Sequence, residues 1–140
     1  MDEANKSGLE GGCKELWSEF RGVLSWRWDG RFEAVLAEFS AAKKENIRTI
    51  LERSLRNTWE SSNIGNAPDR VREIGSRLGG LRPGQLLFTS DPSREAFIFC
   101  AWWPWGDNKT ISIRIGSSSQ KLSDPEKAEK VQLLKKWFGI

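Results

Sequence analysis

The hydrophobic pattern of this chain changes its period near Gly80, and this change constrains the fold more than any other feature. Before Gly80, apolar residues recur at spacings of three and four, which places one apolar stripe on a helix. After Gly80, alternation typical of a strand appears, most clearly in the run Ile111, Ser112, Ile113, Arg114, Ile115. Because helical and strand patterns occupy separate parts of the chain, the sequence predicts an α+β fold.

Helical spacing predicts three helices before Gly80, at about residues 12–26, 31–60 and 68–78. The middle range is interpreted as one long helix, because its polar residues 40–46 contain no helix breaker; two stacked helices are the alternative. Residues 1–11, which include Gly8 and Gly11 and are followed by Gly12, are expected to form a flexible lead. The remaining residues 12–140 have the length of a single domain.

Turn-forming residues divide the second half of the chain into three strands and a last helix. The strands are expected at residues 85–89, 95–103 and 110–115, separated by turn and loop sequences. Ser123 as a capping residue, followed by Pro125, predicts a C-terminal helix. The predicted architecture is therefore three N-terminal helices, a three-stranded antiparallel meander and one C-terminal helix.

Several residue types and motifs that support catalysis are missing from the sequence. It contains no His and only two Cys, Cys13 and Cys100, which are expected to be buried thiols. Histidine is the commonest transition-metal ligand and the usual proton shuttle at neutral pH, so we expect no metal and no cofactor. The motifs GxSxG, GxxxxGK[ST] and GxGxxG do not occur either. These absences predict a protein that is not an enzyme.

The composition predicts a cytoplasmic protein with no membrane segment. No apolar run approaches the roughly 18 to 20 residues that span a bilayer, and the N-terminal MDEANKSGLEGG lacks the basic and apolar regions of a signal peptide. The net charge is +3, with the basic excess in residues 61–140. Because dedicated nucleic-acid binders usually carry a clustered basic stripe, this excess is too small to indicate a nucleic-acid partner.

Three tryptophans within four positions mark the first candidate binding surface. Trp102 and Trp103 are expected on opposite faces of a strand, with Trp105 in the loop that follows. Exposed Trp residues are enriched at interface hot spots, whereas helices over both sheet faces would place them in the core. Nearby charges would recognise an acidic partner, or would only pair across the strands. We define the primary surface as Arg94, Trp102, Trp103, Trp105, Asp107, Lys109 and Arg114.

A second candidate surface lies between the first two predicted helices. Trp26 and Trp28 would lie about 200° apart on a helix, so both can be buried only if the helix has ended before them. One is expected to pack in the core while the other covers the joint, with neighbouring Arg side chains paired to Asp29 or stacked on Trp. We define the secondary surface as Trp26, Arg27, Trp28 and Arg31.

Together these features predict a small protein-binding module. We favour an immunity-type inhibitor or an adaptor whose Trp and Arg side chains occlude a partner protein with an acidic surface patch. The alternative is single-stranded nucleic-acid binding on the sheet face, with Trp stacked on bases; a small ligand stacked on Trp is a third hypothesis. The apolar stripe of the first helix suits a homodimer interface as well as a core position.

Overall fold

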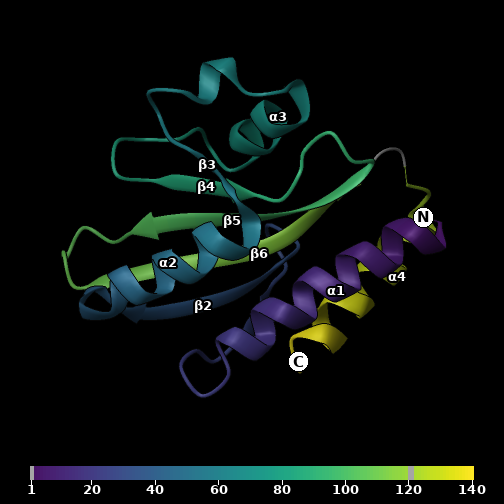
Figure 1. Ribbon diagram of the computed structural model, residues 1–140, viewed down its shortest axis with the longest axis horizontal. Coiled ribbons are helices and arrows are strands. Elements are labelled where there is room, and N and C mark those ends of the chain that lie inside the picture. The colour runs from purple at the N-terminus through teal and green to yellow at the C-terminus, as the bar shows by residue number, and fades with distance from the viewer. Residues whose placement is uncertain (1, 120–121) are drawn as a thin grey trace.

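The computed structural model describes residues 2–119 and 122–140, which contain four α-helices and one six-stranded antiparallel sheet (Figure 1). The helices are α1 (Glu3–Glu19), α2 (Lys44–Leu55), α3 (Asp69–Arg77) and α4 (Asp124–Trp137). The strands are β1 (Arg27–Asp29), β2 (Ala34–Ser40), β3 (Asn57–Trp59), β4 (Leu86–Thr89), β5 (Ala96–Pro104) and β6 (Thr110–Ser119). The short 3₁₀ helices are η1 (Ala41–Lys43) and η2 (Ile64–Asn66).

The strand order of the sheet is β1-β2-β6-β5-β4-β3, with every neighbouring pair antiparallel. Strands β4, β5 and β6 follow one another as a meander, and the hairpin β1–β2 joins it by pairing β2 with β6. The short strand β3 pairs with β4 at the opposite edge. Strands β5 and β6 are therefore central, and their register places Trp102 opposite Ile113 and Trp103 opposite Ser112.

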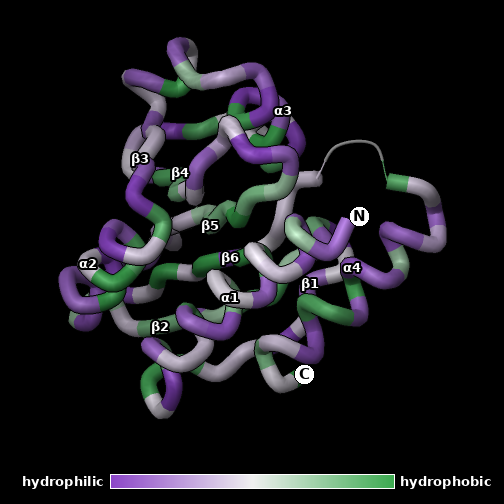
Figure 2. The backbone as a smooth tube through the Cα atoms, turned by 45° about the vertical axis from the view of Figure 1, so that its right-hand side comes forward, coloured by the Kyte–Doolittle hydropathy of each residue, from purple (hydrophilic) through white to green (hydrophobic). Residues whose placement is uncertain are grey.

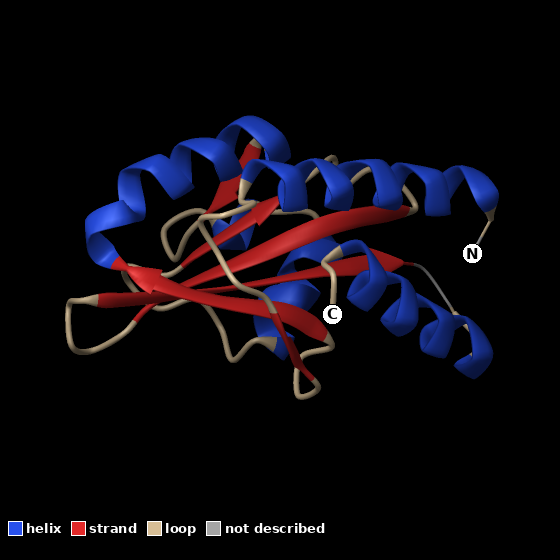
Figure 3. Cartoon of the chain, turned by 90° about the horizontal axis from the view of Figure 1, so that it is seen from below, coloured by secondary structure: helices blue, strands red, loops and turns tan. Residues whose placement is uncertain are grey.

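One side of the sheet, which we call the helix-covered face, packs against α1, α2 and α4. Figure 3 shows α1 and α2 lying along this side of the strands, and Figure 2 shows the hydrophobic colour concentrated on the central strands. The strands contribute the buried side chains Val35, Ala37, Phe39, Phe88, Ile98, Cys100, Trp102, Ile111, Ile113 and Ile115. The helices contribute Leu9, Cys13, Leu16, Ile47, Ile50, Leu51, Leu55, Leu134 and Trp137. Most of the core therefore lies on this side of the sheet.

The other side, which we call the half-covered face, has two different parts. Over β4 and β5, helix α3 closes a smaller core, in which Val71 and Ile74 pack with Leu87, Phe97 and Phe99. Over β2 and β6, the same face carries the polar side chains of Glu38, Ser112 and Arg114, in register positions next to one another. The second part is where the candidate site is found.

Helix α1 begins at Glu3, well before the predicted start at residue 12, and ends at Glu19 rather than at residue 26. Residues 3–11 of the segment expected to be a flexible lead thus form the first turns of this helix, and residue 1 lies outside the described residues. The Asp2 side chain accepts a hydrogen bond from the backbone N–H of Asn5 and caps the helix. Gly12 lets the helix approach the sheet closely, because an added Cβ would lie 2.4 Å from Cδ1 of Ile98.

The prediction of a helix over residues 31–60 is wrong. Residues 34–40 form strand β2, helix α2 occupies only Lys44–Leu55, and residues 57–59 form strand β3. Residues 34–37 are all apolar and all buried, so that their sequence does not distinguish a strand with two covered faces from a helix. The three-residue strands β1 and β3 are too short to show a period.

The three expected strands of the meander exist as β4, β5 and β6, but they make up only half of a larger sheet. The architecture of three N-terminal helices and a three-stranded meander is therefore replaced by four helices and six strands, and the α+β class is confirmed. In the described part of the chain, no helix combines the length and the apolar character needed to cross a bilayer.

Both cysteines are free thiols in the core of the helix-covered face. Burial raises the pKa of the Cys13 thiol to about 12 and also raises the pKa of Cys100. Both side chains therefore remain protonated and act as small apolar residues.

Candidate functional site

Strand alternation separates the two tryptophans of β5. Trp102 is only 4% exposed and packs edge-on against Phe39 and Phe88 in the core of the helix-covered face. Trp103 lies on the half-covered face and is half-buried. Trp102 is therefore a core residue, and Trp103 is the tryptophan of β5 that lies beside the polar part of the sheet.

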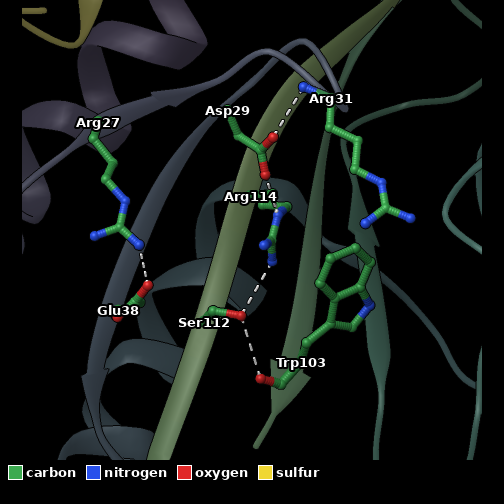
Figure 4. A network of polar contacts seen from close by, with 7 residues as sticks. All are labelled: Arg27, Asp29, Arg31, Glu38, Trp103, Ser112 and Arg114. Carbon is green, nitrogen blue, oxygen red and sulfur yellow. Dashed lines mark hydrogen bonds and ion pairs between the residues drawn. The ribbon is translucent and has the colours of Figure 1, made fainter.

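Arg114 lies on the ring of Trp103 and forms the centre of a polar network (Figure 4). Its guanidinium carbon is 4.3 Å from the Trp103 ring centroid and 5.5 Å from that of Phe32. Its Nε donates to Asp29 Oδ2 at 2.7 Å, and Nη1 donates to the Ser112 hydroxyl at 3.1 Å. Phe32 contacts Trp103 edge-on with centroids 5.4 Å apart. We call Asp29, Phe32, Trp103 and Arg114 the aromatic–charge cluster.

The ion pair of this cluster is largely shielded from solvent, with side-chain exposures of 16% for Arg114 and 14% for Asp29. Burial raises the pKa of Asp29, but hydrogen bonds from Arg114 and from the backbone N–H groups of Arg31 and Phe32 outweigh it and lower the pKa below its ordinary value. Asp29 is therefore ionised at neutral pH and balances the charge of Arg114. The guanidinium of Arg114 is consequently not available for an acidic group on a partner.

The indole Nε1 of Trp103 is buried and has no hydrogen-bond partner among the described residues. A buried polar group without a partner costs roughly 1 to 3 kcal/mol, which makes this atom an exception to normal packing. The Trp103 ring is held by Phe32 and Arg114. The unpaired nitrogen therefore lowers the stability of the fold, whereas the contacts of the ring raise it.

The loop between β5 and β6, which we call the hairpin tip (residues 105–109), displays Trp105. Its side chain is 43% exposed, one of the few large apolar side chains at the surface of the described part of the chain. The loop is closed by a hydrogen bond from the Trp105 N–H to the Thr110 carbonyl at 2.8 Å. The Asp107 carboxylate accepts from the backbone N–H groups of Lys109 (2.9 Å) and Thr110 (3.0 Å).

Asp107 is therefore a turn-stabilising residue, and the backbone N–H of Lys109 is the main reason that its pKa is lowered. Lys109 itself is exposed, and its carbonyl accepts from the Ala41 N–H at 2.7 Å, which ties the hairpin tip to the end of β2. Backbone bonds thus fix the loop that carries Trp105 on two sides.

Arg94 lies apart from the other residues of the primary surface. It sits in the turn before β5, whereas Trp105 follows the end of β5, so that the full length of this strand separates them. The Arg94 carbonyl accepts a hydrogen bond from Arg70 at 2.7 Å. The primary surface therefore divides into the hairpin tip, the buried Trp102, the aromatic–charge cluster and the distant Arg94.

The secondary surface is also divided between the two faces. Trp26 packs edge-on against Phe138 with centroids 4.9 Å apart, and Trp28 lies under the ammonium group of Lys135, both on the helix-covered side. The prediction that one of the two would only cover the joint is therefore wrong. Both pack on one side because α1 has ended and Trp26 and Trp28 are two positions apart in extended chain.

The arginines of the secondary surface face the opposite way. Arg27 pairs with Glu38 of β2 (Figure 4). The Arg31 guanidinium lies 5.0 Å from the Phe32 ring centroid. Parts of both predicted surfaces thus meet on the half-covered face. Sequence reasoning missed the roles of Phe32, Glu38 and Ser112 there. Ser112 lies two positions before Arg114 on β6, whereas Phe32 and Glu38 come to this face through the pairing of β2 with β6.

The described residues contain no group of three or more Cys, Asp or Glu side chains able to hold a metal ion. No family of known proteins, no curated protein and no solved structure matches this chain.

Proposed function

We propose that this chain is a small protein-binding module, of the immunity-protein or adaptor type, that occludes a partner through the hairpin tip. The observation that carries the proposal is the exposed Trp105 on a loop whose backbone is already fixed. Trp is the residue most enriched at interface hot spots, and a fixed loop loses little conformational entropy on binding. Trp105 would fill a pocket of the partner, and Lys109 would pair with an acidic group beside it.

The proposed mechanism is steric and requires no chemical step. Trp105 supplies the buried apolar contact, and Lys109 supplies charge at the rim, where it affects the association rate more than the affinity. Arg114 acts indirectly, because its pairing with Asp29 and its contact with Trp103 hold the base of the hairpin. Under this proposal only Trp105 and Lys109 contact the partner, whereas the sequence-based hypothesis had every Trp and Arg of the primary surface contact it.

Affinity capture from the native host lysate tests this proposal, with the folded protein as bait at low salt and at about 0.5 M salt, after nuclease treatment. We expect one stoichiometric protein that is retained at both salt concentrations. Trp105→Ala should abolish its capture by weakening binding by at least about 2 kcal/mol. Val23→Ala is the matched control, since Val23 is another exposed apolar side chain, 38% exposed and outside the hairpin tip. Equal capture by wild type and Trp105→Ala would contradict the proposal.

A specific observation also favours single-stranded nucleic acid as a second candidate. The half-covered face presents the aromatic rings of Trp103 and Phe32 beside the exposed Arg31, an arrangement that can stack bases and contact phosphates. Two of the nearby guanidinium groups, those of Arg27 and Arg114, are already paired with carboxylates, which makes this candidate the weaker one. Fluorescence titration with an oligonucleotide distinguishes it, because such binding would fall steeply with rising salt.

A further inference from the structure

A concave site, separate from the hairpin tip, lies on the half-covered face between α3, the β1–β2 turn, the end of β6 and the start of α4. Its volume is about 720 Å³, within the usual range of small-molecule pockets, roughly 300 to 1,000 Å³. Neither predicted surface included it, apart from Arg31. We call it the basic pocket, because its lining includes five basic side chains, Arg31, Arg70, Arg77, Lys127 and Lys130.

None of these five basic groups forms an ion pair with a carboxylate among the described residues. Arg70 is a structural residue: it donates to the carbonyls of Arg94 and Glu95 and to the Ser118 hydroxyl, and lies over the Phe97 ring. The other four basic groups make no ion pair with any described residue. Two acidic side chains, Glu33 and Glu73, also line the pocket, so positive charge is in excess.

Lys130 is the most constrained of the unpaired cations. It is half-buried, and its ammonium group donates to the Ser117 carbonyl at 3.3 Å. Burial lowers the pKa of Lys130, Glu33 opposes this effect, and the nearby positive charges of Arg77 and Lys127 lower the pKa further. Three cations close to one another in a concave site repel one another, and a bound anion would relieve this repulsion.

The pocket also has an apolar part, formed by Phe32, Ile74, Leu78 and Phe99. A concave site that combines apolar walls with a few convergent charged groups is typical of small-molecule binding. Lys and Arg groups together suit phosphate, which accepts hydrogen bonds on several oxygens. From this arrangement we propose that the basic pocket binds a phosphorylated small molecule, with its phosphate held by Arg77, Lys127 and Lys130.

Isothermal titration calorimetry with two probes, inorganic pyrophosphate and ADP, tests this site in the full chain at low ionic strength. We expect saturable binding of at least one probe with a Kd below about 1 mM. ADP binding more tightly than pyrophosphate would indicate that the apolar walls contact an organic group, and equal affinities would indicate that the phosphate alone is recognised. Saturable binding of neither probe would overturn the proposal.

The double variant Arg77→Ala/Lys127→Ala locates the binding, because both side chains are exposed residues of helices and their loss should leave the fold intact. It should weaken phosphate binding at least about tenfold, the effect of losing two charge-assisted contacts. Lys43→Ala/Arg82→Ala is the matched control, which removes the same charge from exposed positions outside the pocket and should bind as wild type. Equal weakening in both double variants would show non-specific attraction and overturn the proposal.

The variant Lys130→Met separates a ligand-binding role from a structural one, because phosphate affinity and Tm are measured on the same protein. If Lys130 binds a ligand, replacing its half-buried charge with an apolar side chain of similar length should abolish phosphate binding without lowering the Tm of the free protein. A lowered Tm with unchanged phosphate affinity would assign Lys130 to the fold and remove it from the site.

Discussion

One face of the sheet is apolar and the other carries polar and charged groups, and strand β6 contributes side chains to both. Towards α1, α2 and α4 it presents Ile111, Ile113 and Ile115, all of which are buried. Towards the half-covered face it presents Ser112 and Arg114, which take part in hydrogen bonds, an ion pair and a ring contact. Because one face supplies most of the apolar burial, the other can hold charges and half-buried aromatic rings.

The apolar helix-covered face should dominate stability, and Phe88→Ala tests this most directly. Phe88 is fully buried and contacts Trp102, with ring centroids 6.0 Å apart. Removing its ring should lower the free energy of unfolding by about 3 to 5 kcal/mol, because transfer and cavity costs add. Urea unfolding followed by Trp fluorescence measures the change. A loss below about 1 kcal/mol would show that this face is not the main source of stability.

On the half-covered face, a smaller loss is expected from removing one partner of the ion pair. The Arg114 side chain is only 16% exposed. Asp29→Ala removes the carboxylate that pairs with its guanidinium and leaves this charge unpaired. We expect a loss of about 1 to 3 kcal/mol, less than for a fully buried pair because some solvent reaches the site. The double variant Asp29→Ala/Arg114→Met is the control and should recover part of this loss. No recovery would mean that Asp29 acts through its turn hydrogen bonds instead.

The Asp29–Arg114 ion pair predicts that the stability of the fold depends on pH only in the acidic range. The folded-state pKa of Asp29 lies below its unfolded value of 3.8, so that its ionised form stabilises the fold above this pH. This contribution should be lost as the pH falls through the folded-state pKa. The stability difference between wild type and Asp29→Asn should therefore be constant near neutral pH and shrink below about pH 4. A difference that does not change down to pH 2 would contradict the assignment, and urea titrations at a series of pH values measure it.

The sequence predicted best the strands that are bounded by turn residues or that carry alternating apolar residues. Strand β6 follows from the alternation of Ile111, Ile113 and Ile115. Strand β5 follows from an apolar run bounded by turn residues, and strand alternation placed its Trp102 and Trp103 on opposite faces. Strand β2 escaped detection because the apolar run of residues 34–37 is covered on both faces and, unlike β5, is not followed by turn residues. Its period therefore carried no information about which secondary structure it forms.

Only those contacts of the candidate site that form within one β-hairpin could be predicted from the sequence. Trp103 and Arg114 lie on neighbouring strands of one hairpin, so their proximity follows from its register. Asp29 is 85 positions from Arg114, and their contact depends on the pairing of β2 with β6, which no local pattern encodes. The basic pocket depends in the same way on α3 and α4, whose charged residues look like ordinary solvent-exposed helix faces in the sequence.

The smallest effect on stability is expected at the hairpin tip. Trp105 is 43% exposed, and its loop is held by backbone hydrogen bonds and by Asp107 rather than by the indole ring. Trp105→Ala should therefore change the free energy of unfolding by less than about 0.5 kcal/mol, as expected for a surface position. Asp107→Ala is the comparison variant and should cost more, because it removes the acceptor for two backbone N–H groups. If Trp105→Ala instead destabilises the chain by more than Asp107→Ala, the ring belongs to the fold, and the apolar contact offered to a partner must come from another residue.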